Sequence, residues 1–370
     1  MNVRFIARIG ISAAFLVASL AARPASAATG WPLFEPAVTY PGYGARVVSA
    51  DFNRDGNKDL ATGNAVLLGR GDGRFGPPIP YPDGVSTASL GPFGALASGD
   101  FNRDGYRDLA VAGSRVAILL GRGDGSFTGP SYPNVSFFHP NDIVVADFDA
   151  DGRQDLAVAN ELKTQGLTIL LGTGNGSFTD GGRDYGFNPL SLSVADVNAD
   201  GDPDLVSELG VLPGGAGASF GSLIPIAKPD LVELDNALGD LNHDGLLDLV
   251  VPGFKYTQGD AKGRVNVYLG QGGGHFGSPT RYAIGGVVGG VVVTDLNRDG
   301  RLDVAVAGQP SVSGGQQYVA VLLGQSNATL ASLSTYAAEA PGFLVAADFN
   351  HDHARDLASA RSILLHRPLP

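Results

Sequence analysis

Cysteine is absent from this chain of 370 residues, and methionine and tryptophan occur once each. Without cysteine there can be no disulfide framework and no thiol chemistry. Positive charge is also scarce, because 25 Lys and Arg stand against 37 Asp and Glu and give a formal net charge of −12. Nucleic acids and anionic membranes are bound by clustered cations, so this balance argues against both as partners.

Long apolar runs are missing too, except near the N-terminus. Arg4 and Arg8 precede an apolar stretch over Ile9–Ala22, and Ala25-Ser26-Ala27 follows as a small-residue cleavage site. The stretch is shorter than the roughly 20 residues that span a bilayer. We therefore predict a signal peptide over residues 1–27 rather than a membrane anchor, cleavage near Ala27, and secretion to the extracellular space or periplasm. We expect no membrane span in the mature chain.

What the chain has in abundance is glycine, 54 residues of it, and an internal repeat. Seven nine-residue segments follow the pattern Asp-x-Asn/Asp-x-Asp-Gly-x-x-Asp, with one exception at the glycine. They begin at Asp51, Asp100, Asp147, Asp196, Asp240, Asp295 and Asp348. Each lies between two short apolar runs rich in β-branched residues, and a third run ends in a glycine turn before an aromatic residue. A period near 50 residues fits a four-stranded propeller blade.

The two ends of the chain complement each other. The last repeat stops after its third apolar run, at Ser362–Leu365, whereas Leu33–Tyr40 resembles a fourth strand with no repeat of its own. Pairing these segments would close a ring and leave only short sheet edges. The sequence thus predicts an all-β fold over residues 28–370, a seven-bladed β-propeller of four-stranded antiparallel blades.

The acidic segments are candidate calcium sites. Ca²⁺ takes six to eight oxygen ligands, and side chains at positions 1, 3, 5 and 9, with the carbonyl of position 7, would supply them. An EF-hand is excluded because position 12 carries no Glu and a strand follows. We expect six or seven Ca²⁺ ions, held by residues of the seven loops. The predicted ligands are Asp51, Asn53, Asp55, Asn57, Asp59, Asp100, Asn102, Asp104, Tyr106, Asp108, Asp147, Asp149, Asp151, Arg153, Asp155, Asp196, Asn198, Asp200, Asp202, Asp204, Asp240, Asn242, Asp244, Leu246, Asp248, Asp295, Asn297, Asp299, Arg301, Asp303, Asp348, Asn350, Asp352 and Asp356.

With its Asp-Phe-Asn-x-Asp-Gly-x-x-Asp-Leu motif, the chain resembles the FG-GAP and VCBS repeat family, whose propellers are similar to the head of integrin α subunits. The resemblance implies Ca²⁺ in the hairpin between the first two strands of each blade. The last loop departs from the pattern, because His353 replaces the glycine. A residue other than glycine is strained at positive φ, so we expect that site to be the weakest or empty.

Other motifs predict less. Arg70-Gly71-Asp72 and Arg122-Gly123-Asp124 match an adhesion tripeptide, but we interpret them as hairpin turns, since other repeats have unrelated residues there. The six histidines have no zinc-ligand spacing, and there is no Gly-x-Ser-x-Gly nucleophile motif.

Partner binding is expected on the face opposite the acidic loops, where the connections vary in length. The candidate surface combines two such connections and consists of Lys255, Tyr256, Asp260, Lys262, Gln316, Gln317 and Tyr318. We expect a monomeric binding or adhesion module for a protein or carbohydrate, with structural Ca²⁺, rather than an enzyme. A calcium-dependent polysaccharide lyase and a lectin stay open as alternatives, because the fold does not decide the function.

Overall fold

The computed structural model describes residues 33–41, 46–86, 94–135, 139–160, 166–183, 185, 188–227, 232–257, 260–311, 315–326, 329–339 and 342–367. Residues Pro32–Pro370 form one compact unit. The predicted signal peptide and its cleavage site lie outside the described residues and stay predictions. None of the helices in the described part is long and apolar enough to cross a membrane.

Seven antiparallel sheets make up this unit, and each is called here a blade, numbered after the acidic loop that it carries. The strands of the first three blades are β2 (Val48–Ala50), β3 (Asp59–Ala61), β4 (Ala65–Leu67) and β5 (Ile79–Pro80) in blade 1, β6 (Ala95–Gly99), β7 (Asp108–Ala112) and β8 (Val116–Leu119) in blade 2, and β9 (Pro140–Ala146), β10 (Asp155–Asn160), β11 (Leu167–Gly172) and β12 (Phe178–Arg183) in blade 3. An isolated bridge between Ile118 and Ser131 stands in for the fourth strand of blade 2.

Blades 4 to 7 follow the same order. Their strands are β13 (Ser193–Ala195), β14 (Asp204–Ser207), β15 (Gly210–Leu212) and β18 (Ile224–Pro225) in blade 4, β19 (Val232–Glu233), β20 (Ala237–Gly239), β21 (Asp248–Thr257), β22 (Asp260–Tyr268) and β25 (Thr280–Ala283) in blade 5, β26 (Val287–Thr294), β27 (Asp303–Gln309), β28 (Tyr318–Gly324) and β29 (Leu330–Ala337) in blade 6, and β30 (Val345–Ala347), β31 (Asp356–Ala358), β32 (Ser362–Leu364) and β1 (Val38–Thr39) in blade 7. Two small hairpins pair β16 (Gly214–Gly215) with β17 (Ser219–Phe220) and β23 (Gly270–Gly272) with β24 (His275–Phe276). The described residues contain one helix, the 3₁₀ turn η1 (Pro82–Gly84).

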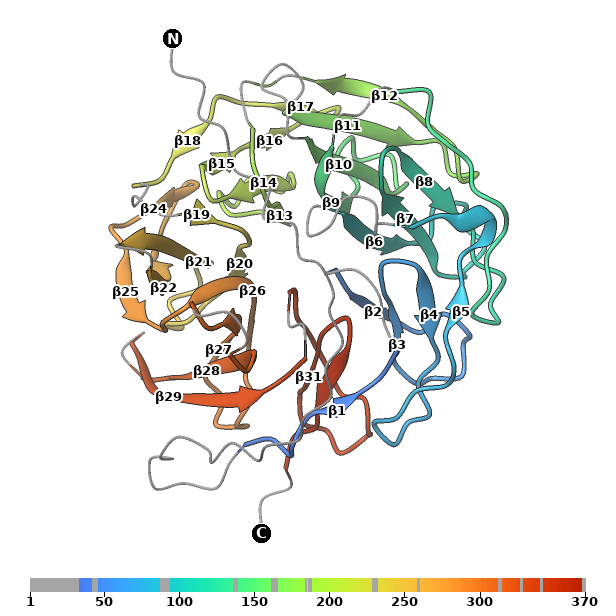
Figure 1. The fold of residues 1–370 in the computed structure, drawn as a ribbon. Helices are drawn as coiled ribbons and strands as arrows, with labels where there is room; N and C mark the ends of the chain where they lie inside the picture. Colours follow the sequence, from blue (N-terminus) through green and yellow to red (C-terminus); the bar gives the residue numbers. More distant parts are fainter. Residues whose placement is uncertain are drawn as a thin grey trace. The chain divides into compact units, whose positions relative to one another are not determined.

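The blades are arranged in a ring with the first strand of each blade nearest the centre (Figure 1). The N-terminal segment closes the ring as expected: Val38 and Thr39 of β1 pair with Ile363 and Ser362 of β32. Each sheet thereby has its edges inside the ring or at its rim, and the predicted seven-bladed β-propeller is confirmed.

The hydrophobic core consists of seven clusters, and each cluster is shared by two neighbouring blades. Leu60 and Ala61 of β3 illustrate the cause, since Leu60 packs with blade 7 and Ala61 packs with blade 2. Successive residues of a strand point to opposite faces of its sheet, and in the ring both faces are covered. The second and third strands are therefore continuously apolar instead of alternating.

The repeated aromatic residues link each blade to the next. Phe52 at position 2 of the first acidic loop packs edge-on against Phe127 of blade 2, with the ring centroids 5.9 Å apart. The carbonyl of Phe52 also accepts a hydrogen bond from the Gly125 amide, 3.2 Å away, in the glycine turn of blade 2. Equivalent hydrogen bonds run from Gly73 to Phe349 and from Gly176 to Phe101. The acidic loop of one blade is thus anchored by the glycine turn of its neighbour.

Candidate metal sites

Each acidic loop joins the first and second strands of its blade, and its polar side chains bind its own backbone. In blade 2, the Asp100 carboxylate accepts hydrogen bonds from the amides of Asp104 (3.1 Å) and Gly105 (3.0 Å). The Asn102 amide oxygen accepts from the Asp104 amide (3.1 Å), and Asp104 Oδ1 accepts from the Tyr106 amide (2.8 Å). The same pattern of positions recurs around the ring, so the sequence repeat corresponds to a repeated loop geometry.

Two residues of every loop have positive φ. Position 6, the expected one, has φ of 80–94° wherever it is glycine. Nothing lies within 4 Å of the Cβ that a residue would add there, so these glycines are needed for their backbone conformation and not for space. Position 4 is also left-handed in all seven loops, with φ of 57–64°, although it is never glycine. Sequence reasoning missed this second bend, because Arg, Ala and His at position 4 give no sign of it.

The bends bring positions 1, 3 and 5 together. In blade 3, one carboxylate oxygen each of Asp147, Asp149 and Asp151 lies within 4.8 Å of the others. Blade 3 is the one repeat with a carboxylate at position 3; the other six have Asn there. Arg153 forms an ion pair with Asp151, as Arg301 does with Asp299, so a cation would compete with these guanidinium groups for the position-5 carboxylate. This oxygen-rich set suits Ca²⁺, and ligation by it stays a prediction.

The aspartate at position 9 has a second role that the sequence did not suggest. All seven are fully buried. Asp59 Oδ2 accepts a hydrogen bond from the Phe52 amide and Oδ1 accepts one from the Gly69 amide at the end of β4, each at 2.7 Å. Asp108 holds Phe101 and Gly121 in the same way. Burial raises the pKa of Asp59 to about 6. Each position-9 carboxylate therefore ties its loop to the third strand, whether or not it also contacts a metal ion.

The residue that donates this second hydrogen bond is a glycine in blades 1 and 2, and the structure shows why. A Cβ on Gly69 would lie 2.2 Å from the Lys58 carbonyl oxygen, and a Cβ on Gly121 would lie 2.2 Å from that of Arg107. In blades 1 and 2 a side chain at this point would clash with the acidic loop, whereas in blade 7 His366 makes the same hydrogen bond to Asp356 Oδ1 (2.6 Å).

The last loop keeps the common geometry in spite of His353. The His353 amide donates to Asp348 Oδ2 (3.0 Å) and the Ala354 amide donates to Asp352 Oδ1 (2.8 Å), as in the glycine-containing loops. His353 has φ of 64°, lower than the glycines but still left-handed. The strain that motivated the prediction of a weak or empty site is thus present, and the weak binding itself stays a prediction.

The adhesion-like tripeptides are turns. Asp72 Oδ1 accepts the Arg74 amide (3.0 Å), and Asp124 Oδ1 accepts the Ser126 amide (2.9 Å). Asn175 makes the same contact with Ser177 in blade 3. The side-chain amide of Asn thus accepts the same hydrogen bond as the carboxylate of Asp. This supports the interpretation of the tripeptides as hairpin turns.

The predicted partner surface is altered by the structure. The segment expected to be a long loop in blade 5 is a β-hairpin extension, in which Lys255 pairs with Lys262 and Tyr256 with Ala261. Tyr256 is 54% exposed, whereas the ring of Tyr318 lies against Gly308 and its hydroxyl donates to the Gly285 carbonyl (2.7 Å). Gln316 is exposed and Gln317 is half-buried, and the side chain of Asp260 lies outside the described residues. Tyr318 supports the fold, so Tyr256 is the better candidate for contact with a partner.

Sequence reasoning also missed a charged cluster at the centre of the ring. Arg46, just before β2, forms an ion pair with Asp142 of β9 at 3.3 Å and donates to the Asn141 carbonyl at 3.0 Å. Its guanidinium carbon lies 3.5 Å from the ring centroid of Phe343 in blade 7. Arg46 thus joins blades 7, 1 and 3.

Asp142 and its counterpart in blade 5 also cap neighbouring strands. Asp142 accepts the Leu192 amide and Asp235 accepts the Val291 amide, each at 2.9 Å. Arg46, Asp142, Asp235 and Phe343 all lie five residues before position 1 of their acidic loops. Comparing that position across the repeats would have revealed the cluster. These groups are engaged by one another and by backbone amides, which favours a structural role over catalysis.

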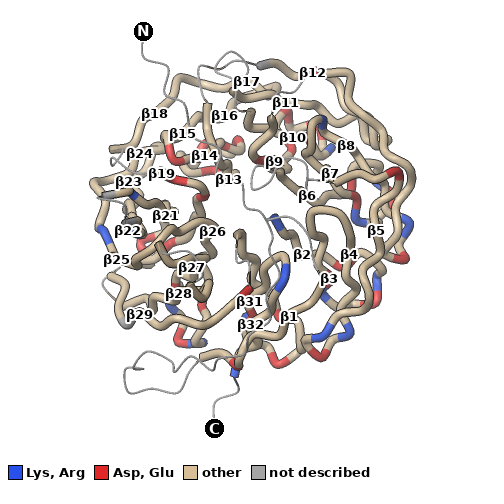
Figure 2. Tube along the Cα trace, viewed as in Figure 1, with Lys and Arg blue, Asp and Glu red and all other residues tan. Residues whose placement is uncertain are grey.

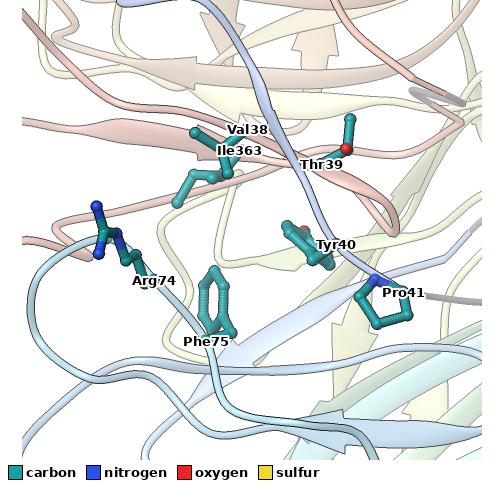
Figure 3. Close-up of a pocket in the computed structure, with 8 residues that line it drawn as sticks. Val38, Thr39, Tyr40, Pro41, Arg74, Phe75 and Ile363 are labelled. Carbon is teal, nitrogen blue, oxygen red and sulfur yellow. The ribbon is translucent and has the colours of Figure 1, made fainter.

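One cavity lies where the ring closes. It measures about 270 Å³ and is lined mainly by β1 and the glycine turn of blade 1. Tyr40 and Phe75 face each other across it with ring centroids 5.2 Å apart (Figure 3). The Tyr40 hydroxyl is directed to the carbonyls of Ser359 and Ser362. This cavity belongs to the apolar seam that seals blade 7 against blade 1.

The repeat architecture has a counterpart among known families. A family model described as an FG-GAP-like repeat matches residues 51–111, 100–158, 147–207 and 240–306. Among solved structures, the chain is similar to the crystal structure of the V. cholerae biofilm matrix protein Bap1, with a TM-score of 0.48 and 11% identity over 94% of this chain and 90% of that chain. No curated protein matches the chain.

Proposed function

The chain belongs to the FG-GAP-like repeat family, and from this premise we propose that it is a secreted, calcium-stabilised propeller that acts as an interaction module. The observation that carries the proposal is the convergence of Asp147, Asp149 and Asp151 in a loop whose hydrogen-bond pattern recurs around the ring. Carboxylates this close repel one another unless a cation lies between them. Ca²⁺ would bind the folded loops and stabilise the propeller by mass action.

The interaction role rests on what the scaffold leaves available. The charged cluster at the ring centre is engaged in holding strands. A rigid ring that presents loops of different sequence is instead suited to recognition. Secretion is supported by the charged, apolar and small-residue segments within residues 1–27.

A metal count and a thermal melt of residues 28–370 test the calcium proposal. We expect six or seven Ca²⁺ ions per chain and a melting temperature that falls by many degrees in excess chelator. Each site at a Ca²⁺ concentration of 100 times its Kd would contribute about 2.7 kcal/mol. One ion or none per chain, with the same melt in Ca²⁺ and in chelator, would refute the proposal.

A single substitution makes the test local. Asp149→Asn gives blade 3 the same position 3 as the other six loops, and Asn can still accept the Asp151 amide as Asp149 does. The variant should bind Ca²⁺ more weakly in one site and melt like the parent protein in excess chelator. Unchanged calcium affinity at every site would mean that the three carboxylates hold no ion.

A further inference from the structure

Cations are distributed very unevenly on the face of the ring that carries the acidic loops. Four repeat positions are compared: the fourth and eighth of the acidic loop, and the second and sixth of the glycine turn, which is counted from Gly69 in blade 1 and from Gly121 in blade 2. Blades 1 and 2 have Lys or Arg at seven of their eight such positions, and these residues are called the basic arc: Arg54, Lys58, Arg70, Arg74, Arg103, Arg107 and Arg122. The same positions of blades 3, 4 and 5 hold no Lys or Arg.

The repeat serves as an internal control and shows that folding does not require these charges. Arg54 and Arg103 have φ of 60° and 62° at position 4, and Ala150 and Ala199 adopt 60° and 64° at the same position. Position 8, which is Lys58 in blade 1, is Leu247 in blade 5. Because apolar and small residues build the same loops, the arc must be explained by something other than loop geometry.

The side chains of the arc are available to a partner. All seven are exposed, and none forms an ion pair with a described carboxylate, in contrast to Arg153 and Arg301. Arg54 lies over the ring of Tyr106 from the next blade, at 5.2 Å from its centroid, which joins the two halves of the arc. In Figure 2 several of the blue segments lie along the right and lower-right rim, over blades 1 and 2, with red segments among them.

Bound Ca²⁺ would make the net charge of this surface positive. On this face blades 1 and 2 carry the seven cations of the arc and eight aspartates, a net charge of −1. Two Ca²⁺ ions in their acidic loops would change the net charge to +3. This step rests on the proposed calcium function, and it makes the surface more attractive to polyanions when the loops are loaded.

We propose that the basic arc binds an anionic polysaccharide through its carboxylate groups. Six of the seven cations are Arg, whose planar guanidinium can bind a carboxylate through two parallel hydrogen bonds. The arc extends over two neighbouring blades, so an extended chain of acidic sugars could contact it through several of its sugar units at once. Single-stranded nucleic acid would need exposed aromatic side chains on which its bases could stack. Tyr106 is covered by Arg54. The other aromatic residues in the acidic loops and glycine turns of blades 1 and 2 are buried or half-buried; they are Phe52, Phe75, Phe101 and Phe127.

The probe is a hyaluronan oligosaccharide, titrated against residues 28–370 in Ca²⁺ at about 50 mM salt, where charge contacts are strong. The test variant is Arg70→Gln/Arg74→Gln/Arg122→Gln, which leaves the acidic loops untouched; Gln already stands at position 2 of the glycine turn in blades 5 and 6. The control variant Arg264→Gln/Arg281→Gln/Arg361→Gln removes three exposed cations outside the arc. We expect the test variant to bind at least about tenfold more weakly, the control to bind within twofold of the parent, and chelator to weaken the parent.

Each outcome bears on the proposal. Calcium binding with no hyaluronan binding, or with equal loss in both variants, overturns the basic arc and leaves the calcium scaffold intact. Hyaluronan binding that depends on the arc in a protein that holds no Ca²⁺ supports the arc and overturns the calcium function. Tighter binding of a single-stranded DNA oligonucleotide than of hyaluronan overturns the choice of polysaccharide.

Discussion

Replacing Arg46 by Met tests whether the ring is held from its centre. Arg46 lies 3.3 Å from Asp142, donates to the Asn141 carbonyl and covers the ring of Phe343. The side chains of Arg46 and Asp142 are only 12% and 8% exposed. Met keeps most of the length and the apolar stem of Arg but removes its charge and its hydrogen-bond donors. The buried carboxylate of Asp142 would then have no counter-charge.

The expected loss is about 3–5 kcal/mol of unfolding free energy at pH 8, the typical cost of breaking a buried ion pair by removing one partner. The loss should depend on pH. The Arg46 guanidinium lowers the pKa of both Asp142 and Asp235, although burial raises each of them overall. Its contribution is therefore present while these carboxyls are ionised and is lost as the pH falls and they take up protons. The difference between parent and variant should shrink from pH 8 to pH 5.

Urea unfolding of both proteins at several pH values, in excess chelator to remove any effect of Ca²⁺, measures this difference. The double variant Arg46→Met/Asp142→Asn should recover part of the lost stability, because it no longer buries an unpaired charge. A loss below about 1 kcal/mol that stays the same from pH 5 to pH 8 would show that the cluster does not hold the ring.

Three further predictions concern single sites. Asp235→Asn should flatten the dependence of unfolding free energy on pH between 4 and 8, because burial raises the pKa of Asp235 to about 7, so that the parent loses stability as the pH rises through that value. His353→Gly should stabilise the protein by about 1 kcal/mol in urea unfolding by relieving a left-handed residue, and should tighten calcium binding at the last loop; weaker binding there would contradict the strain argument. Gly121→Ala should lower the unfolding free energy by about 3 kcal/mol, because its Cβ would lie 2.2 Å from the Arg107 carbonyl oxygen. Gly105→Ala, whose Cβ would meet no atom, should lower it by only about 1 kcal/mol because of the positive φ. Equal melting temperatures for the two variants in excess chelator would refute this explanation of the third-strand glycine.

The architecture was predictable from periodic patterns in the sequence. Seven copies of one acidic loop, separated by short apolar runs, predict the number of blades and the common four-strand plan, from which blades 2 and 5 depart with three and five strands. The pairing of Val38 with Ile363 was predictable because the last repeat lacks a fourth strand and the first segment supplies one. These features are local or strictly periodic, and a period is visible in sequence without knowledge of any contact. The grouping of positions 1, 3 and 5 in one loop was predictable for the same reason, and their role as metal ligands stays a prediction.

The groups that the loops contact beyond their own residues could not be predicted without the three-dimensional structure. Asp59 was expected to be a metal ligand, and the fold shows that it also ties the Phe52 and Gly69 amides together across the blade. The ion pair between Arg46 and Asp142 joins residues 96 positions apart in the sequence, and their blades, 1 and 3, are not neighbours in the ring. Contacts of this kind depend on closure of the ring, which brings the equivalent ends of all inner strands to one centre. The repeat makes these ends equivalent, but only their meeting in space lets an arginine from one blade neutralise an aspartate from another.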